Sequence, residues 1–199
     1  MKDVGVSGVW RARGHIWDTR QRPVVMGILN LTPDSFSDGG KYRSVEEAVE
    51  AGLRMVEEGA EILDLGGEST RPGAKPVALE EELRRVIPVL ERLRPLTKVA
   101  ISIDTSKAEV ARQALELGAD IVNDVTALRG DERMLEVVAG SECGVVLMHM
   151  QGRPETMQIA PKYEDAPTEV FDFLRQRMEE VERAGVMRER ICLDPGLGF

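Results

Sequence analysis

Six polar residues recur along the chain, each at or just past the end of a short aliphatic run. Asparagine occurs only twice in the sequence, and both copies belong to this set. Any one of the six could be a helix cap or a turn former, but together they indicate a polar site built from several strand ends. The residues are Asn30, Asp64, Asp104, Asn123, His149 and Asp194.

The aliphatic runs predict buried parallel strands, because they lack the alternation of a strand that faces water on one side. They cover residues 24–29, 62–65, 99–103, 121–122, 145–148 and 191–193. Between them lie amphipathic helical patterns with recognisable ends. Ser44 followed by Glu47 is typical of a capping box, and Gly59 and Gly118 stand where two helices should stop.

Strands that alternate with helices form a parallel sheet, which is either doubly wound or closed into a barrel. A doubly wound sheet concentrates its ligands at one switch point, whereas a barrel collects them from many strand ends. Six contributing strand ends favour a TIM (β/α)8 barrel, of which this chain holds about six βα units. We expect a single domain over residues 1–199, with residues 1–23 as an N-terminal extension leading into the first strand.

The composition and net charge limit the kinds of partner that the protein is expected to bind. The 199 residues are 42% hydrophobic and 31% charged, enough for one core, and the net charge is −9 without a basic block. We therefore expect no nucleic-acid partner, no membrane partner, and a small-molecule ligand. Cys143 and Cys192 lie far apart, which fits reduced thiols, and no apolar run reaches signal-peptide or membrane-spanning length. These features predict a cytoplasmic location.

Two predicted connections, residues 30–43 and 66–78, are longer than usual for an α/β unit. The first is rich in hydroxyl and carboxylate groups around one aromatic residue. The second contains glycines that permit close backbone approach, and Arg71 offers a planar guanidinium to an anion. Both are candidate lids over the carboxyl ends of the strands.

The loop sequences resemble one known family. The strings MGILNLTPDSFSDGG, LDLGGESTRPGA, ISIDTSK, IVNDVTAL, LMHMQGRPETMQ and LDPGLGF occur in this order and closely resemble dihydropteroate synthase, over residues 24–199. The resemblance implies a TIM barrel that joins 6-hydroxymethyl-7,8-dihydropterin pyrophosphate to 4-aminobenzoate and releases pyrophosphate with the help of Mg²⁺. It also implies a homodimer.

The resemblance assigns residues to three parts of a site. The pterin would contact Asp104, Asn123, Met148, Gln151 and Asp194. A pterin presents a row of N–H donors and a carbonyl, which carboxylates and an amide can pair with. His149 stays outside the catalytic set, since a core role suits it equally well.

The family's remaining contacts fall on the first strand end and on the two long loops. Mg²⁺ and pyrophosphate would lie near Asn30. As catalytic residues, Asp38 would face the cation that develops at the pterin methylene, and Arg71 would balance the departing pyrophosphate. The 4-aminobenzoate pocket would be formed by Phe36, Ser69, Thr70, Pro72 and Phe199.

Family members continue past the equivalent of Phe199 with a Gly-Lys, a Ser-Arg-Lys and an Arg-x-His, so the chain is expected to be truncated and, alone, inactive. Two alternatives stay open. One is a methyltetrahydrofolate-dependent corrinoid methyltransferase, against which the anion-binding loops argue. The other is a non-catalytic pterin-binding paralogue.

Overall fold

The computed structural model describes residues 8–32, 44–69, 76–152, 156–157 and 160–197. The strands are β1 (Val9–Ala12), β2 (His15–Asp18), β3 (Met26–Asn30), β4 (Ile62–Gly66), β5 (Ala100–Asp104), β6 (Ile121–Asp124), β7 (Gly144–Met148) and β8 (Ile191–Asp194). The helices are α2 (Val45–Glu57), α3 (Leu79–Leu93), α4 (Ala108–Glu116), α5 (Met134–Ala139) and α6 (Ala166–Arg183), with short 3-10 helices η1 (Arg94–Leu96) and η2 (Arg188–Arg190).

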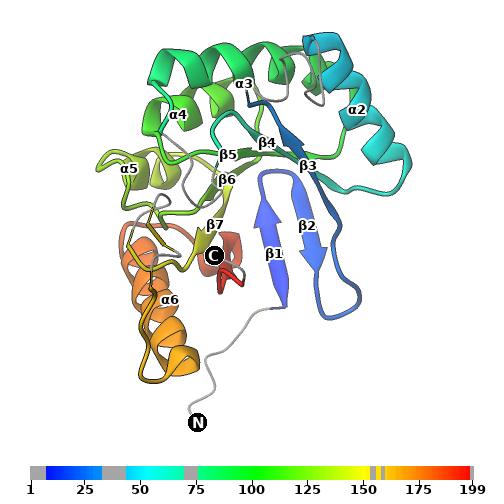
Figure 1. Cartoon of the computed structure of the whole chain (residues 1–199). Coiled ribbons are helices and arrows are strands. Elements are labelled where there is room, and N and C mark those ends of the chain that lie inside the picture. The colour runs from blue at the N-terminus through cyan, green and yellow to red at the C-terminus, as the bar shows by residue number, and fades with distance from the viewer. Residues whose placement is uncertain (1–7, 33–43, 70–75, 153–155, 158–159, 198–199) are drawn as a thin grey trace.

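The main sheet has six parallel strands in the order β3-β4-β5-β6-β7-β8, so every strand lies beside its neighbour in sequence. The helices all cover the same face of this curved sheet (Figure 1). That progression is the barrel type of winding, since a doubly wound sheet reverses direction and places helices on both faces. The predicted α/β-barrel topology is confirmed over these six units, and within the described residues β3 and β8 each pair on one side only.

Helix boundaries follow local signals. Ser44 Oγ accepts a hydrogen bond from the Glu47 backbone N–H at 3.3 Å, as predicted for the start of α2. Gly59 and Gly118 adopt φ angles of +109° and +98° just after α2 and α4. These left-handed conformations end the helices at little cost only because glycine has no Cβ.

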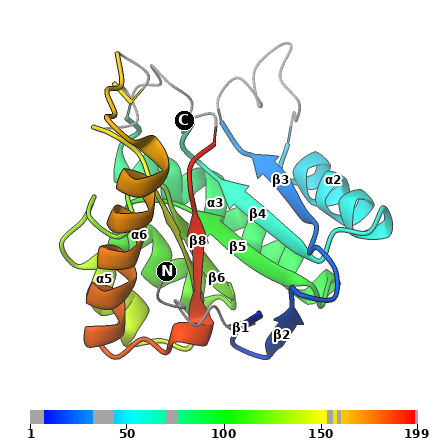
Figure 2. The same ribbon diagram turned by 90° about the horizontal axis from the view of Figure 1, so that it is seen from below.

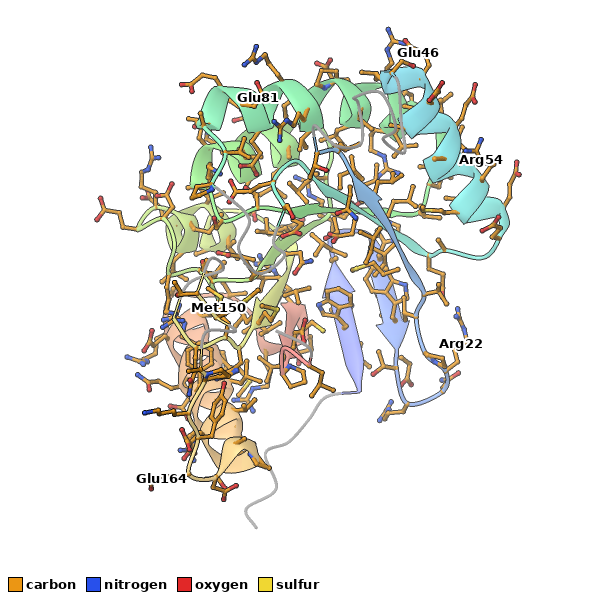
Figure 3. All side chains as sticks on the ribbon, in the orientation of Figure 1. Arg22, Glu46, Arg54, Glu81, Met150 and Glu164 are labelled. Carbon is orange, nitrogen blue, oxygen red and sulfur yellow. The ribbon has the colours of Figure 1, made fainter. Side chains whose placement is uncertain are left out.

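The main core lies between the strands and the helices. Strand residues on this outer face, such as Leu63, Leu65 and Ile103, are fully buried against helix residues such as Val86 and Leu90. The opposite faces of the helices carry charged groups, as Figure 3 shows for Glu46, Arg54 and Glu81, which point away from the sheet. No helix among the described residues is both long and apolar enough to cross a bilayer.

Residues 9–18 form an antiparallel hairpin, β1–β2, where the sequence predicted only an extension. Figure 2 shows the hairpin at the amino-terminal end of the main sheet. Trp10 and Trp17 pack with Ile62 and Ile121 in a separate buried cluster. The Trp10 Nε1–H donates a hydrogen bond to the Arg190 carbonyl at 3.1 Å. The hairpin therefore closes one end of the strands and leaves the other end for the loops.

Candidate active site

Strand register collects most of the predicted pterin residues at one end of the sheet. Gly66 stands opposite both Asn30 and Asp104, Asp104 stands opposite Asn123, and Met148 stands opposite Asp194. Because side chains two residues apart share a face, these positions project from the face opposite the helices. The register thus places all five predicted residues at the carboxyl ends of their strands, namely Asn30, Asp104, Asn123, Met148 and Asp194. This end of the sheet lies away from the hairpin (Figure 2).

Asp64 holds the amide of Asn123. It lies inside β4 and is 4% exposed, and its Oδ2 accepts a hydrogen bond from Asn123 Nδ2 at 3.2 Å. This contact fixes which side of the amide donates, leaving the Asn123 carbonyl oxygen as an acceptor for a ligand. Sequence reasoning included Asp64 among the strand-end residues but gave it no role; a lone carboxylate within an aliphatic strand was the available signal.

Two buried carboxylates at this end have an oxygen without a partner. Among the described residues, Asp64 Oδ1 and Asp104 Oδ1 are both buried and unpaired. Burial raises the pKa of Asp64. Burial, reinforced by the nearby charges of Asp64 and Asp124, raises the pKa of Asp104 well above its ordinary value. Unpaired buried acceptors are costly, so this end of the sheet is chemically suited to a polar ligand that donates N–H groups.

The β7–β8 side of the site combines apolar and polar groups. Met148 is buried in a cluster with Val125, Met150 and Met157. Asp194 Oδ1 accepts a hydrogen bond from the Gly196 backbone N–H at 2.8 Å, which orients the carboxylate in the turn after β8. The side-chain contacts of Met148 form an apolar wall beside this oriented carboxylate.

Gln151 and His149 are held by other contacts. Gln151 Nε2 donates to the Lys162 carbonyl at 2.7 Å, and Gln151 Oε1 accepts from the Lys162 N–H at 3.1 Å, so the backbone engages both ends of the amide. The His149 ring makes an edge contact with Phe173 at a centroid distance of 5.1 Å. Burial, aided by the positive charge of Arg129, lowers the pKa of His149, so it is neutral at pH 7.

Asn30 is the described residue predicted to bind metal. It is half-buried at the end of β3. No group of three His, Cys, Asp or Glu side chains among the described residues forms a metal cage. A single amide oxygen at the rim fits Mg²⁺ that takes its other ligands from water and phosphate. The donor set is thus compatible with a metal that arrives with its substrate.

Ser69 of the predicted 4-aminobenzoate set is half-buried three residues beyond the end of β4. The other predicted residues of the two long loops and of the chain's end lie outside the described residues. They are Phe36, Asp38, Thr70, Arg71, Pro72 and Phe199.

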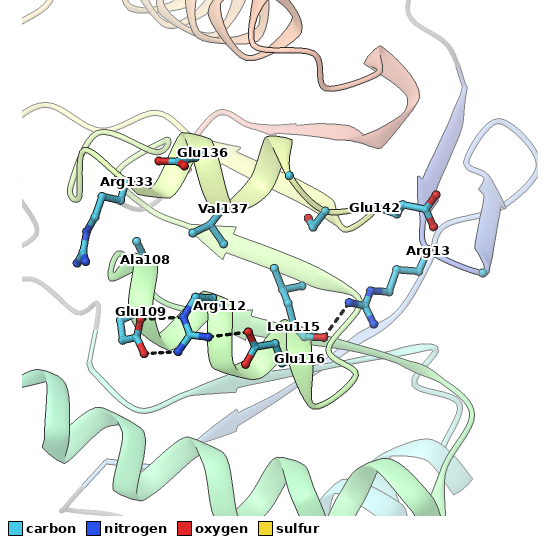
Figure 4. Close-up of a pocket in the computed structure, with 13 residues that line it drawn as sticks. Arg13, Ala108, Glu109, Arg112, Leu115, Glu116, Arg133, Glu136, Val137 and Glu142 are labelled. Carbon is cyan, nitrogen blue, oxygen red and sulfur yellow. Dashed lines mark hydrogen bonds and ion pairs between the residues drawn. The ribbon is translucent and has the colours of Figure 1, made fainter.

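A groove of about 920 Å³ lies elsewhere, between α4 and α5 on the helix side (Figure 4). Its charged side chains largely satisfy one another. Arg112 pairs with both Glu109 and Glu116 at 2.6 Å, and Arg13 Nη2 donates to the Leu115 carbonyl at 2.7 Å. This groove lacks the unpaired buried acceptors found at the strand ends, so the strand ends remain the candidate site.

The sheet winding and the polar strand ends agree with a comparison of sequences. The pattern shared by pterin binding enzymes matches residues 26–199. The chain therefore belongs to the pterin-binding enzyme family.

Several of the similar proteins in that family bear the name dihydropteroate synthase. The chain is 51% identical over 177 residues to the dihydropteroate synthase of Escherichia coli strain K12, covering 89% of this chain and 62% of that protein. It thus spans less than two thirds of that relative's length.

Solved structures show the same fold over part of their length. The Yersinia pestis dihydropteroate synthase in a sulfonamide drug complex superposes with a TM-score of 0.89 at 45% identity, covering 96% of this chain and 69% of that one. The Xanthomonas albilineans dihydropteroate synthase with 4-aminobenzoic acid gives a TM-score of 0.86 at 52% identity, covering 98% and 68%.

Proposed function

We propose that the protein is a dihydropteroate synthase, which condenses 6-hydroxymethyl-7,8-dihydropterin pyrophosphate with 4-aminobenzoate to give 7,8-dihydropteroate and pyrophosphate. The observation that carries this proposal is the pair of buried, unpaired carboxylate oxygens on Asp64 and Asp104, beside an oriented Asn123 amide. Relatives at about half identity that bear this name, and one solved with 4-aminobenzoic acid, support the substrate assignment.

Pterin recognition is assigned to the described strand ends. Asp194 and Asp104 accept hydrogen bonds from the N–H edge of the pterin, and Asn123 offers its carbonyl oxygen. Met148 packs against the ring, and Gln151 borders it. These groups bind and orient the substrate, because carboxylates and amides complement the donors and acceptors of the heterocycle without a reaction of their own.

Catalysis is assigned to charge stabilisation. Breaking the bond between the pterin methylene and pyrophosphate leaves a cation conjugated with the ring, so an arylamine needs little activation to attack it. Asp38 stabilises this cation, and Arg71 stabilises the leaving pyrophosphate. Asn30 would hold Mg²⁺, which when bound supplies further positive charge to the pyrophosphate.

The 4-aminobenzoate site is assigned to Ser69 together with residues of the two long loops and the end of the chain. The assignment rests on the resemblance of the loop sequences, and the similar Xanthomonas albilineans structure contains 4-aminobenzoic acid. The set comprises Phe36, Ser69, Thr70, Pro72 and Phe199.

A direct test measures pyrophosphate release by the purified full-length protein as the 4-aminobenzoate concentration is varied. We expect saturable, 4-aminobenzoate-dependent release that requires Mg²⁺. Asp194→Asn should weaken pterin binding in calorimetry, whereas Asp172→Asn, a substitution on α6, should not. Pterin binding without release would instead identify a non-catalytic pterin-binding protein, and release that is independent of 4-aminobenzoate would also refute the proposal.

The homodimer and the cytoplasmic location stay predictions from the resemblance and the composition. Sedimentation of the full-length protein measures the first. For the isolated 199 residues we expect no turnover, because β3 and β8 are each unpaired on one side among the described residues and leave the site open to water.

A further inference from the structure

The carboxylate of Glu68 joins the two ends of the second long loop. Glu68 stands two residues after β4, and Val77 stands two residues before α3. Glu68 Oε2 accepts a hydrogen bond from the Val77 backbone N–H at 3.0 Å. The same oxygen accepts one from Lys107 Nζ at 2.5 Å. One side chain therefore fixes the start and the end of the loop relative to each other.

Lys107 connects this loop to the helix layer. Its Nζ also pairs with Glu82 Oε2 at 2.5 Å, and the Glu82 side chain is fully buried in α3. Burial lowers the pKa of Lys107, but hydrogen bonds to Glu68 and Glu82 outweigh burial and raise it overall. The ammonium thus stays charged between two carboxylates, an arrangement that we call the Glu68–Lys107–Glu82 clamp.

The base of the loop is packed tightly on α3. A Cβ added at Gly67 would lie 2.8 Å from Val86 Cγ2 and 2.9 Å from Glu82 Cγ. Arg85 Nη1 donates a hydrogen bond to the Gly67 carbonyl at 2.7 Å. The backbone just before Glu68 is therefore fixed by contacts on both sides.

Lys107 is also close in sequence to the pterin side of the site. It follows Asp104 by three residues, and its backbone N–H donates to Thr105 Oγ1 at 3.1 Å in the turn that leads into α4. The clamp thus links the exit of β5, which carries Asp104, to Glu68 and Ser69 just after β4. The Lys107 ammonium pairs with both carboxylates, and Glu82 Oε1, the other oxygen of the Glu82 carboxylate, is buried without a hydrogen-bond partner among the described residues.

We propose that Glu68 and Lys107 are positioning residues that hold Ser69 for 4-aminobenzoate, without contacting either substrate. This inference rests on the proposed function. Since Ser69 directly follows Glu68, a loss of the ion pair releases Ser69, the described residue of the predicted 4-aminobenzoate set. The pterin side keeps its own contacts, including that between Asp64 and Asn123.

Glu68→Gln is the primary variant, because it leaves the buried Lys107–Glu82 pair intact and keeps an acceptor for the Val77 N–H. In the full-length enzyme we expect the KM for 4-aminobenzoate to rise about tenfold, equivalent to about 1.4 kcal/mol. The dissociation constant for 6-hydroxymethylpterin, measured by calorimetry, should stay within about twofold of wild type.

Two further variants and a control complete the experiment. Lys107→Met should raise the KM for 4-aminobenzoate at least as much, and Lys107→Arg, which keeps the charge, should recover part of the loss. Glu80→Gln changes an exposed glutamate in the first turn of α3, the helix that carries Glu82. This control should behave as wild type. Hydrogen exchange of a peptide containing Val77 should accelerate in Glu68→Gln and not in Glu80→Gln.

The outcomes separate this inference from the proposed function. An inactive wild-type protein refutes the function, and the exchange rate at Val77 still tests the clamp. An active wild type with an unchanged 4-aminobenzoate KM in Glu68→Gln overturns the inference. Equal weakening of pterin and 4-aminobenzoate binding, accompanied by a lower melting temperature, also overturns it, since that pattern indicates a general structural role.

Discussion

Replacing Asp104 by asparagine should stabilise the protein while weakening its ligand binding. Asp104 Oδ1 is buried without a partner, and the charges of Asp64, Asp124, Glu82 and Glu68 all raise the pKa of its carboxyl group in addition to burial. A buried polar atom without a hydrogen bond costs about 1–3 kcal/mol, and more when it is charged. Asp104→Asn keeps the shape and removes the charge. We therefore expect the free energy of unfolding to rise by about 1–3 kcal/mol at pH 8.

The difference in free energy of unfolding between Asp104→Asn and wild type should depend on pH. A carboxyl group whose pKa is raised in the folded state holds its proton more tightly there than in the unfolded chain. Stability is therefore lost as the pH rises from the ordinary value of 3.8 through the raised pKa. The difference between Asp104→Asn and wild type should be small near pH 4 and complete above the raised pKa.

Urea unfolding followed by circular dichroism at several pH values, on the full-length protein without ligand, measures this difference. Asp120→Asn is the matched control at the opposite end of the strands. Asp120 Oδ2 accepts hydrogen bonds from the Ile101 N–H and from Arg94 Nη1, both at 2.9 Å, so its replacement should destabilise. A less stable Asp104→Asn at pH 8, or a difference that does not vary with pH, would refute the reasoning. Calorimetry should show weaker pterin binding by the same variant.

Three other substitutions or treatments have defined outcomes. Gly67→Ala should lower the free energy of unfolding by about 1–3 kcal/mol in urea titrations, because the new methyl group meets Glu82 Cγ at 2.9 Å; unchanged stability would contradict the close packing. Trp10→Phe should cost about 0.5–1.5 kcal/mol through loss of the hydrogen bond to Arg190, beyond any change in packing; a cost of zero would mean that this bond contributes nothing. Burial and the charge of Asp194 raise the pKa of the Cys192 thiol to about 11. Iodoacetamide should therefore alkylate Cys192 slowly at pH 8 in the native state and rapidly in denaturant. Rapid labelling of the native protein would show that the pKa of this thiol is not raised.

The sequence predicted the sheet well because its four central strands are largely buried on both faces, and the two outer strands, β3 and β8, are also aliphatic. Each of the six predicted runs overlaps an observed strand with boundaries shifted by at most two residues, as for 24–29 against Met26–Asn30. A residue such as Leu65 must be apolar whether it faces a helix or the interior, so composition alone marks the strand. The placement of Asp104 and Asn123 at strand ends then indicated which edge carries the site.

Other features depend on contacts that no local pattern contains. The hairpin is stabilised by Trp17 against Ile121 and by Trp10 against Arg190, partners more than a hundred residues away. The role of Asp64 depends on the neighbouring Asn123 amide, and the engagement of Gln151 depends on the Lys162 backbone. Such pairings follow from register and loop path, which emerge only once the sheet is assembled.

The hairpin also constrains the order in which the polypeptide acquires its structure. During translation residues 9–18 leave the ribosome before their partners, since the Trp10 Nε1–H bonds to the carbonyl of Arg190 and the Arg13 N–H to that of Glu142. Contacts between residues so far apart in sequence form late, because the intervening chain must lose its conformational entropy before the contact can stabilise the fold. The two tryptophans of the nascent hairpin therefore lack their complete packing until β7 and β8 are made.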